Sequence, residues 1–253
     1  MKRNINSLIG FTIGATDGEI GEVTDFYFDD KTWTIRYLVV KTGSWLFGRK
    51  VLLSPKALLA PDWENEVFPV NLTREQVKGS PDIDTEMPVS RQNEMDLYNY
   101  YPWGGYYWNA AMGTSGMGIS YPIGLSDEDS NEHNTSDNDK SGHDMLLRST
   151  DAVTAYAIQA IDGEIGEVED FIIDDDTWTI SFLEVDTGNW FPGKKVLIAP
   201  KWIKEINWKN ASVIVNASEE EVKNSPEYIP AQAVSDAYEA SLMGYYGRLI
   251  RRD

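Results

Sequence analysis

The residues in this sequence best suited to chemistry are carboxylates gathered in two short segments. Each segment places consecutive Asp residues directly after a strand-like stretch: Asp29, Asp30, Asp174, Asp175 and Asp176. Hard divalent cations take oxygen ligands, so weak binding of Mg²⁺ or Ca²⁺ is one interpretation. The other is a solvated turn, because Asp side chains hydrogen-bond nearby backbone amides. The turn is the favoured interpretation, so these residues are weak metal candidates and we predict no resident metal.

Other catalytic chemistry finds little support. His133 and His143 both lie in a polar stretch, and the sequence contains no Cys. It has no Gly-x-Ser-x-Gly motif, no phosphate-binding loop and no dinucleotide fingerprint. We therefore predict no catalytic residue, no cofactor and no enzymatic activity.

One segment is strongly aromatic. Seven of the eleven residues from 98 to 108 are Tyr or Trp, namely Tyr98, Tyr100, Tyr101, Trp103, Tyr106, Tyr107 and Trp108. Exposed, such a segment would be an interaction surface, since Tyr and Trp provide rigid, amphipathic contact area. Packed inside the protein, it would only fill space. Both alternatives stay open, and these seven residues are the candidate interaction site.

Charge excludes one class of partner. The 253 residues include 41 acidic and 22 basic ones, for a net charge of −19. Nucleic-acid binders need clustered Lys and Arg, so we expect no nucleic-acid partner. No apolar run is long enough for a transmembrane helix, and no signal peptide is evident. The absence of Cys suits a soluble, cytoplasmic protein; peripheral association with a membrane complex stays open.

The elements that must position these residues occur twice. Asp17 to Val23 recurs, 145 residues later, as Asp162 to Val168, and the same offset relates Trp33 to Trp178 and Trp63 to Trp208. The period is too long for a solenoid, so each copy is expected to be a domain. An unbroken offset also predicts two like folds related by a pseudo-two-fold axis.

Each copy has the pattern of short β-strands. Asp-Gly dipeptides predict tight turns, and segments dense in β-branched and aromatic residues, Trp33–Val40 and Trp178–Val185, predict central strands. In the second of these, Ser181 and Glu184 mark a wetter face. Thr73 with Gln76 and Ser218 with Glu221 form capping boxes before short helices. Five or six short strands favour a small closed barrel, because closure removes exposed edges.

These residues resemble a known family, the PRC-barrel domain, shared by the photosynthetic reaction-centre H subunit and a ribosome-maturation factor. The pattern is Asp-Gly-x-Ile-Gly-x-Val-x-Asp-Phe, then Asp-Asp-x-Thr-Trp-x-Ile, Leu-x-Val-x-Thr-Gly-x-Trp and a closing Pro-Lys. It spans Asp17–Lys56 and Asp162–Lys201. The resemblance implies a mainly β fold with two small β-barrels in tandem that pack against partners or order an assembly. The membrane-anchoring helix of the reaction-centre subunit is absent, and no catalytic residue is implied.

The expected organisation has five parts. They are a first barrel at 1–84, a helical arm with the aromatic segment at 85–124, a flexible acidic linker at 125–147, a second barrel at 148–229 and a C-terminal helical arm at 230–253. The linker is rich in Ser, Asp, Glu and Asn, so it cannot bury enough apolar surface to offset its ordering entropy.

Two functions are compatible with this organisation. The first is a non-enzymatic module for protein interaction or assembly, with protein partners or self-association. The alternative is a small-ligand or divalent-cation binding protein that uses a barrel mouth or the groove between barrels. The paired tryptophans could line such a pocket, although core filling is favoured; the pairs are Trp33/Trp178, Trp45/Trp190 and Trp63/Trp208. Trp45-Leu46-Phe47-Gly48 is a weaker contact candidate.

Overall fold

The computed structural model describes residues 1–81, 96–97, 99–101, 147–188, 194–230 and 234–249. The elements of the first repeat are β1 (Lys2–Asn4), η1 (Ile5–Leu8), β2 (Thr12–Ala15), β3 (Gly18–Asp29), β4 (Ile35–Thr42), η2 (Ser44–Leu46), β5 (Lys50–Leu53), η3 (Pro55–Ala57), β6 (Val67–Pro69) and α1 (Arg74–Lys78). Those of the second are β7 (Leu147–Ser149), α4 (Thr150–Val153), β8 (Ala157–Gln159), β9 (Glu164–Asp174), β10 (Thr179–Asp186), β11 (Lys195–Ile198), η6 (Pro200–Trp202), β12 (Ile203–Asn207), β13 (Ser212–Val215), α5 (Glu219–Lys223) and α6 (Asp236–Leu249).

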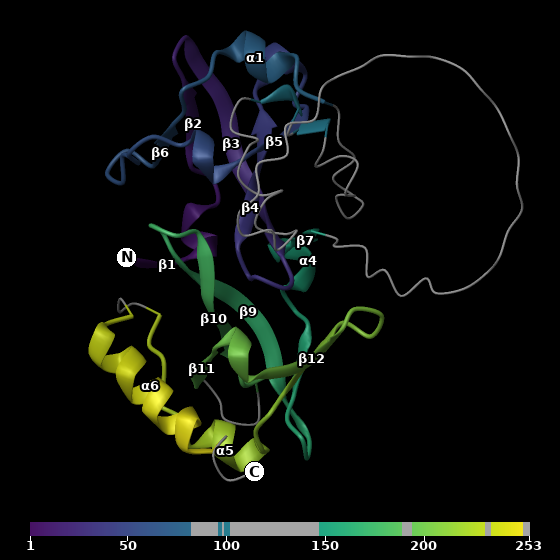
Figure 1. The fold of residues 1–253 in the computed structure, drawn as a ribbon, viewed down its shortest axis with the longest axis vertical. Helices are drawn as coiled ribbons and strands as arrows, with labels where there is room; N and C mark the ends of the chain where they lie inside the picture. The colour runs from purple at the N-terminus through teal and green to yellow at the C-terminus, as the bar shows by residue number, and fades with distance from the viewer. Residues whose placement is uncertain (82–95, 98, 102–146, 189–193, 231–233, 250–253) are drawn as a thin grey trace, which may run out of the picture.

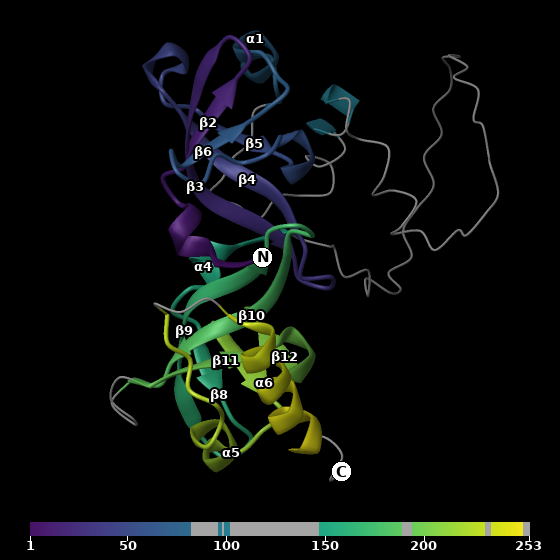
Figure 2. The same cartoon turned by 90° about the vertical axis from the view of Figure 1, so that its left-hand side faces the viewer.

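The mainly β architecture expected from the sequence is confirmed, as is the repetition. One sheet has the order β5-β4-β3-β2-β6 and the other β11-β10-β9-β8-β13-β12, so corresponding strands occupy corresponding places. The two repeats lie end to end along the long axis of the molecule, and their sheets meet in the middle (Figures 1 and 2). Among the described helices, none combines the length and the apolar composition that a membrane span needs.

The sheets do not close into barrels among the described residues, which corrects the expected closure. In each repeat the strand path is open, with β5 or β11 at one end. The reason lies at Pro55 and Pro200, which cannot donate to a ladder and which begin the 3-10 helices η3 and η6. Each 3-10 helix turns the chain into a segment that pairs with β6 or β13. The two end strands of each sheet are thus connected through the 3-10 helix, and their described residues do not hydrogen-bond to each other.

The core of each repeat follows from its strand pattern. Fully buried Phe and branched aliphatic side chains line the inner faces, and the largest are Phe26, Phe28, Phe68, Phe171 and Phe182. Burying one such side chain stabilises the fold by about 2–3 kcal/mol. Phe28 and Phe171 lie with ring centroids 5.9 Å apart, so the cores of the two repeats are in contact.

The two repeats exchange their first strands. β1 belongs to the first repeat by sequence but pairs antiparallel with β9, with Asn4 opposite Ile172. Reciprocally, β7 pairs with β3, with Ser149 opposite Tyr27. Ser149 lies 145 residues after Asn4, and Ile172 lies 145 residues after Tyr27. The two exchanged strands therefore pair in the same register.

The centre of this arrangement is a pair of symmetric backbone bonds. Thr34 forms an antiparallel bridge with Thr179, its own counterpart. The amide of Ile35 donates to the carbonyl oxygen of Trp178, and that of Ile180 to Trp33, both at 2.7 Å. The two repeats are therefore related by the pseudo-two-fold that the unbroken offset predicts.

Local signals in the sequence are largely confirmed. Thr73–Gln76 and Ser218–Glu221 form complete capping boxes at α1 and α5. The predicted C-terminal arm is the helix α6. Trp33 and Trp178 were expected to begin the central strands, but both have φ near +55° and end the preceding turns instead. The expectation of a wet face at Glu184 is wrong, because that side chain is 2% exposed.

Candidate functional site

The aromatic segment is described only at its start. Tyr100 is 40% exposed, and its hydroxyl donates to the carbonyl oxygen of Gln76 at 2.8 Å. Tyr101 is buried, and burial raises the pKa of its hydroxyl to about 12. The other five candidate residues, Tyr98, Trp103, Tyr106, Tyr107 and Trp108, lie outside the described residues.

The second arm repeats this anchorage. Tyr245 donates to the carbonyl oxygen of Glu221 at 2.7 Å, and the buried Tyr246 stacks on Trp202 with centroids 4.2 Å apart. In each arm, a Tyr hydroxyl thus donates to the short helix of the same repeat, and Figure 2 shows α6 lying along the second repeat. Tyr101 is an anchor in the first repeat rather than an exposed contact.

The acidic turns are occupied by groups of the protein itself. The carboxylate of Asp29 accepts amides from Lys31 and Thr32 at 2.9 and 3.0 Å, and that of Asp174 accepts the amides of Asp176 and Thr177. These are the turn contacts that Asp favours.

The second carboxylate of each turn faces an arginine of the exchanged strand. Asp175 lies 2.6 Å from Nε of Arg3, and Asp30 lies 3.1 Å from Nε of Arg148. Burial acts to raise the pKa of Asp175, but hydrogen bonds from the amine of Met1 and from Arg3 outweigh it and lower that pKa. Although carboxylate oxygens of Asp174, Asp175 and Asp176 lie within 4.8 Å of one another, the cluster is used to join the repeats.

Each of these arginines also lies over a tryptophan. Cζ of Arg3 is 3.5 Å from the ring centroid of Trp63, and Cζ of Arg148 is 3.9 Å from that of Trp208. The guanidinium thus connects an aromatic ring of one repeat to a carboxylate of the other. The predicted core role suits Trp63 and Trp208, which pack against the core while half-buried. For the pair Trp45 and Trp190, the whole of Trp190 and the side chain of Trp45 lie outside the described residues.

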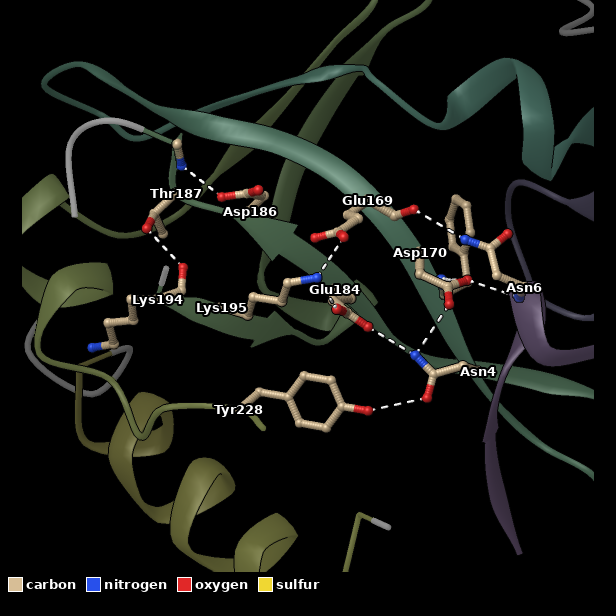
Figure 3. A network of polar contacts seen from close by, with 12 residues as sticks. Asn4, Asn6, Glu169, Asp170, Glu184, Asp186, Thr187, Lys194, Lys195 and Tyr228 are labelled. Atoms are coloured by element: carbon tan, nitrogen blue, oxygen red, sulfur yellow. Dashed lines mark hydrogen bonds and ion pairs between the residues drawn. The ribbon is translucent and has the colours of Figure 1, made fainter. Parts of the chain in front are cut away.

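A polar network joins Asn4 of the exchanged strand β1 to side chains of β9, β10 and β11 and to Tyr228 (Figure 3). The side-chain amide of Asn4 donates to Asp170 at 3.1 Å and to Glu184 at 2.8 Å, and its oxygen accepts from the hydroxyl of Tyr228 at 3.0 Å. Lys195 forms ion pairs with Glu184 and Glu169. The network therefore contains three carboxylates and one ammonium.

Burial dominates the electrostatics of this network. Asp170 and Glu184 are 5% and 2% exposed, and burial raises the pKa of each carboxyl above its ordinary value. In the first repeat Thr24 and Val39 stand in place of Glu169 and Glu184, so the two carboxylates that pair with Lys195 have no counterpart there. Only that difference between the copies could have signalled it in the sequence.

A groove lies where the two repeats and the second arm meet. Its volume is about 490 Å³, and its lining residues are Lys31, Thr32, Trp33, Thr179, Ile180, Ser181, Ala199, Pro200, Lys201, Glu239 and Met243. They come from the β3–β4 turn of the first repeat and from β10, η6 and α6 of the second. The volume is in the range of small-molecule sites, about 300–1,000 Å³.

The weaker contact candidate, the turn after η2, presents one aromatic side chain to solvent. Phe47 is 98% exposed, and its backbone has φ = +55°, a conformation that residues other than Gly rarely adopt. The hydroxyl of Thr42 and the guanidinium of Arg49 hold this turn through backbone carbonyls. Phe47 is therefore held outward by a fixed turn.

Comparison with known proteins agrees with this architecture. The PRC-barrel domain matches residues 2–76 and 156–222, which together make up more than half of the chain. A search of curated proteins finds no match. The duplicated sheets, the paired acidic turns and these two matched segments agree with one another, and the chain belongs to the PRC-barrel family, with two such domains in tandem.

Proposed function

We propose that this protein is a non-enzymatic, cytoplasmic assembly module, which holds protein partners or further copies of itself at a fixed spacing. The observation that carries the proposal is the reciprocal exchange of β1 and β7. Because each repeat completes its sheet with a strand of the other, the two domains form one rigid unit. A rigid unit with two related ends is suited to ordering other proteins.

The use of the polar side chains supports this proposal. Arg3, Arg148 and Asn4 all contact carboxylates across the boundary between repeats. The charged groups that sequence reasoning would assign to chemistry therefore serve cohesion between the domains. Function then belongs to the surface, as membership of a family without implied catalytic residues also suggests.

We further propose that the aromatic segment, residues 98–108, is the main contact surface. Its beginning is fixed, since Tyr101 is buried and Tyr100 is bonded to Gln76. The residues that follow include Trp103, Tyr107 and Trp108, which have the composition of binding hot spots. An anchored aromatic segment loses less conformational entropy on binding than a free one.

Partner capture tests the proposal. The tagged chain should recover specific proteins, or a second copy, from extract of the native cell. The triple variant Trp103→Ser, Tyr107→Ser and Trp108→Ser should lose them while keeping its far-UV circular dichroism. The matched control replaces two other exposed apolar residues, Leu59→Ser and Ile229→Ser, which are 52% and 48% exposed. Unchanged partners and unchanged oligomeric mass in the triple variant would contradict the assignment.

A second candidate function is small-ligand binding in the groove between the repeats. The observation that favours it is the concave surface around Trp33, Ser181 and Met243. A thermal-shift screen with metabolites and metal salts tests it, since a compound that binds only the native state raises the melting temperature. The absence of any stabilising compound would remove this candidate and leave the assembly proposal standing.

A further inference from the structure

The groove between the repeats is lined by a small residue at a position where the first repeat has a large one. Ser181 lines the groove on β10. Its counterpart in the first repeat is Arg36, whose side chain is 14% exposed and whose Nη1 lies 3.4 Å from Asp29. Burial lowers the pKa of Lys56, the counterpart of Lys201, and the nearby charge of Arg36 lowers it further. The first repeat thus has a half-buried Arg side chain where the second has the small Ser181.

The ring contacts of the paired tryptophans Trp33 and Trp178 also differ. Trp178 lies against two rings, Phe26 at 6.3 Å and Phe68 at 5.9 Å between centroids. Trp33 stacks on Phe28 at 5.3 Å, and the counterpart of Phe68 in the second repeat is the smaller Val213. Trp33 is half-buried and lines the groove.

The charge of the groove is opposite to that of the whole molecule. Glu239 is paired with Lys2 at 3.0 Å, so its charge is compensated within the protein. Lys31 and Lys201 also line the groove, and both are exposed. A surface with two ammonium groups beside an indole ring and Met243 is complementary to an anion with an apolar body.

We propose that this groove binds a small organic anion with a flat aromatic body, such as an aromatic carboxylate. The ring lies against Trp33 and Met243, and the carboxylate faces Lys31 and Lys201. This inference rests on the second candidate function and specifies the class of its ligand. The net charge of −19 disfavours anions elsewhere on the molecule, so the two lysines also provide selectivity.

The test uses 2-naphthoate as the probe and isothermal titration calorimetry on the full chain. We expect saturable binding, with much weaker binding of the cation 1-naphthylmethylamine. Ser181→Arg, which copies the first repeat, should lower the affinity at least about tenfold, whereas Ser181→Ala should leave it unchanged. Lys31→Gln with Lys201→Gln should lower it about threefold to tenfold.

Matched controls separate the possible failures. Lys204→Gln with Lys209→Gln removes the same charge from exposed positions outside the groove and should have no effect. Equal affinity for the acid and the amine would overturn the ligand class and leave ligand binding in the groove standing. Full affinity in a folded Ser181→Arg, or no saturable binding of any probe, would overturn the site itself. If Ser181→Arg fails to fold, the two double-lysine variants are compared instead. Equal affinity of the Lys31/Lys201 variant and the Lys204/Lys209 variant for 2-naphthoate would overturn the proposal.

Discussion

At the scale of single residues, the most informative feature is the use of charge between the repeats. Arg3 and Arg148 each combine a ring contact in their own repeat with a carboxylate of the other. They are a quarter exposed or less, so the interaction is partly desolvated and stronger than a surface ion pair. The Asp turns that first suggested metal binding are the acceptors of these arginines.

This arrangement predicts a stability effect. Arg148→Ala removes a cation–π contact and an ion pair, and it should lower the free energy of unfolding by about 1–3 kcal/mol. Urea denaturation measures it as a lower midpoint with an unchanged slope. Lys209→Ala, at an exposed turn, should change the midpoint very little. Equal effects of the two variants would show that the arginine contributes no more than surface charge.

The buried carboxylates of the second repeat predict a pH effect. Burial raises the folded-state pKa of Glu184 above its ordinary 4.5. Its stabilising contribution is then fully present below about pH 4.5 and is lost as the pH rises through the folded-state pKa. Glu184→Gln should therefore show a smaller decrease in unfolding free energy than the parent between mildly acidic and neutral pH.

Thermal or urea unfolding across this pH range measures the difference, with the exposed Glu205→Gln as control. The lowered pKa of Asp174 and Asp175 acts in the opposite sense, because their contribution is lost as the pH falls below their ordinary 3.8. The pH range in which Glu184 loses its contribution therefore does not overlap the range in which Asp174 and Asp175 lose theirs. Parallel pH profiles of Glu184→Gln and the parent would contradict the role of burial.

At the scale of elements, the sequence predicted most of what local interactions decide. The capping boxes, the acidic turns and the C-terminal helix were all evident, because each depends on residues close together in the chain. The environment of Glu184 was not evident. A lone Glu in an apolar strand indicates a wet face unless its partners Asn4 and Lys195 are known, and those partners are distant in sequence.

The strand exchange was also beyond the sequence. β1 and β7 have three residues each, too few for a periodic pattern, and nothing local distinguishes pairing within a repeat from pairing between repeats. The groove is lined by residues of both repeats, including Ser181 where the first repeat has Arg36. For that reason the paired aromatic residues alone could not locate it.

The long strands β3 and β9 cross their neighbours closely at one glycine each, which predicts an element-scale effect. A Cβ on Gly166 would lie 1.9 Å from the carbonyl oxygen of Asp186, so Gly166→Ala must displace the β9–β10 ladder. We expect a loss of about 2–3 kcal/mol in unfolding free energy. At Gly244 in α6 a Cβ meets no atom within 4 Å, so Gly244→Ala should stabilise by up to about 1 kcal/mol.

Chemical denaturation of the two variants compares the same substitution in a strand crossing and on a helix. A Gly166→Ala protein as stable as the parent would show that the backbone there can move apart at little cost. The close approach would then be unimportant for the fold.

At the scale of the whole molecule, the exchanged strands make the two repeats interdependent. The contacts between them include both exchanged ladders, the Thr34–Thr179 bridge and the contact of Phe28 with Phe171. Such an interface combines hydrogen bonds with apolar burial, unlike the loose contact of domains that are merely tethered.

Cutting the chain between the repeats tests this cohesion. A specific protease site inserted between Ser126 and Asp144 should allow complete cleavage while both halves remain one particle of the original mass. Size-exclusion chromatography with light scattering measures that mass, and the uncut chain is the control. Two particles of about half the mass would show that the exchanged strands do not hold the repeats together.

The exchange also determines when the protein can fold during its own synthesis. Arg148 and its partner Asp30 are 118 residues apart, so β3 waits for the ribosome to add that length before β7 can pair with it. At about 5–20 residues per second this interval is roughly 6–24 s. Throughout it, the nascent first repeat carries an unpaired strand edge beside Phe28, a surface on which aggregation can begin. Cells that make this protein therefore have reason to keep its translation fast, or to shield the growing chain with a chaperone, over that interval.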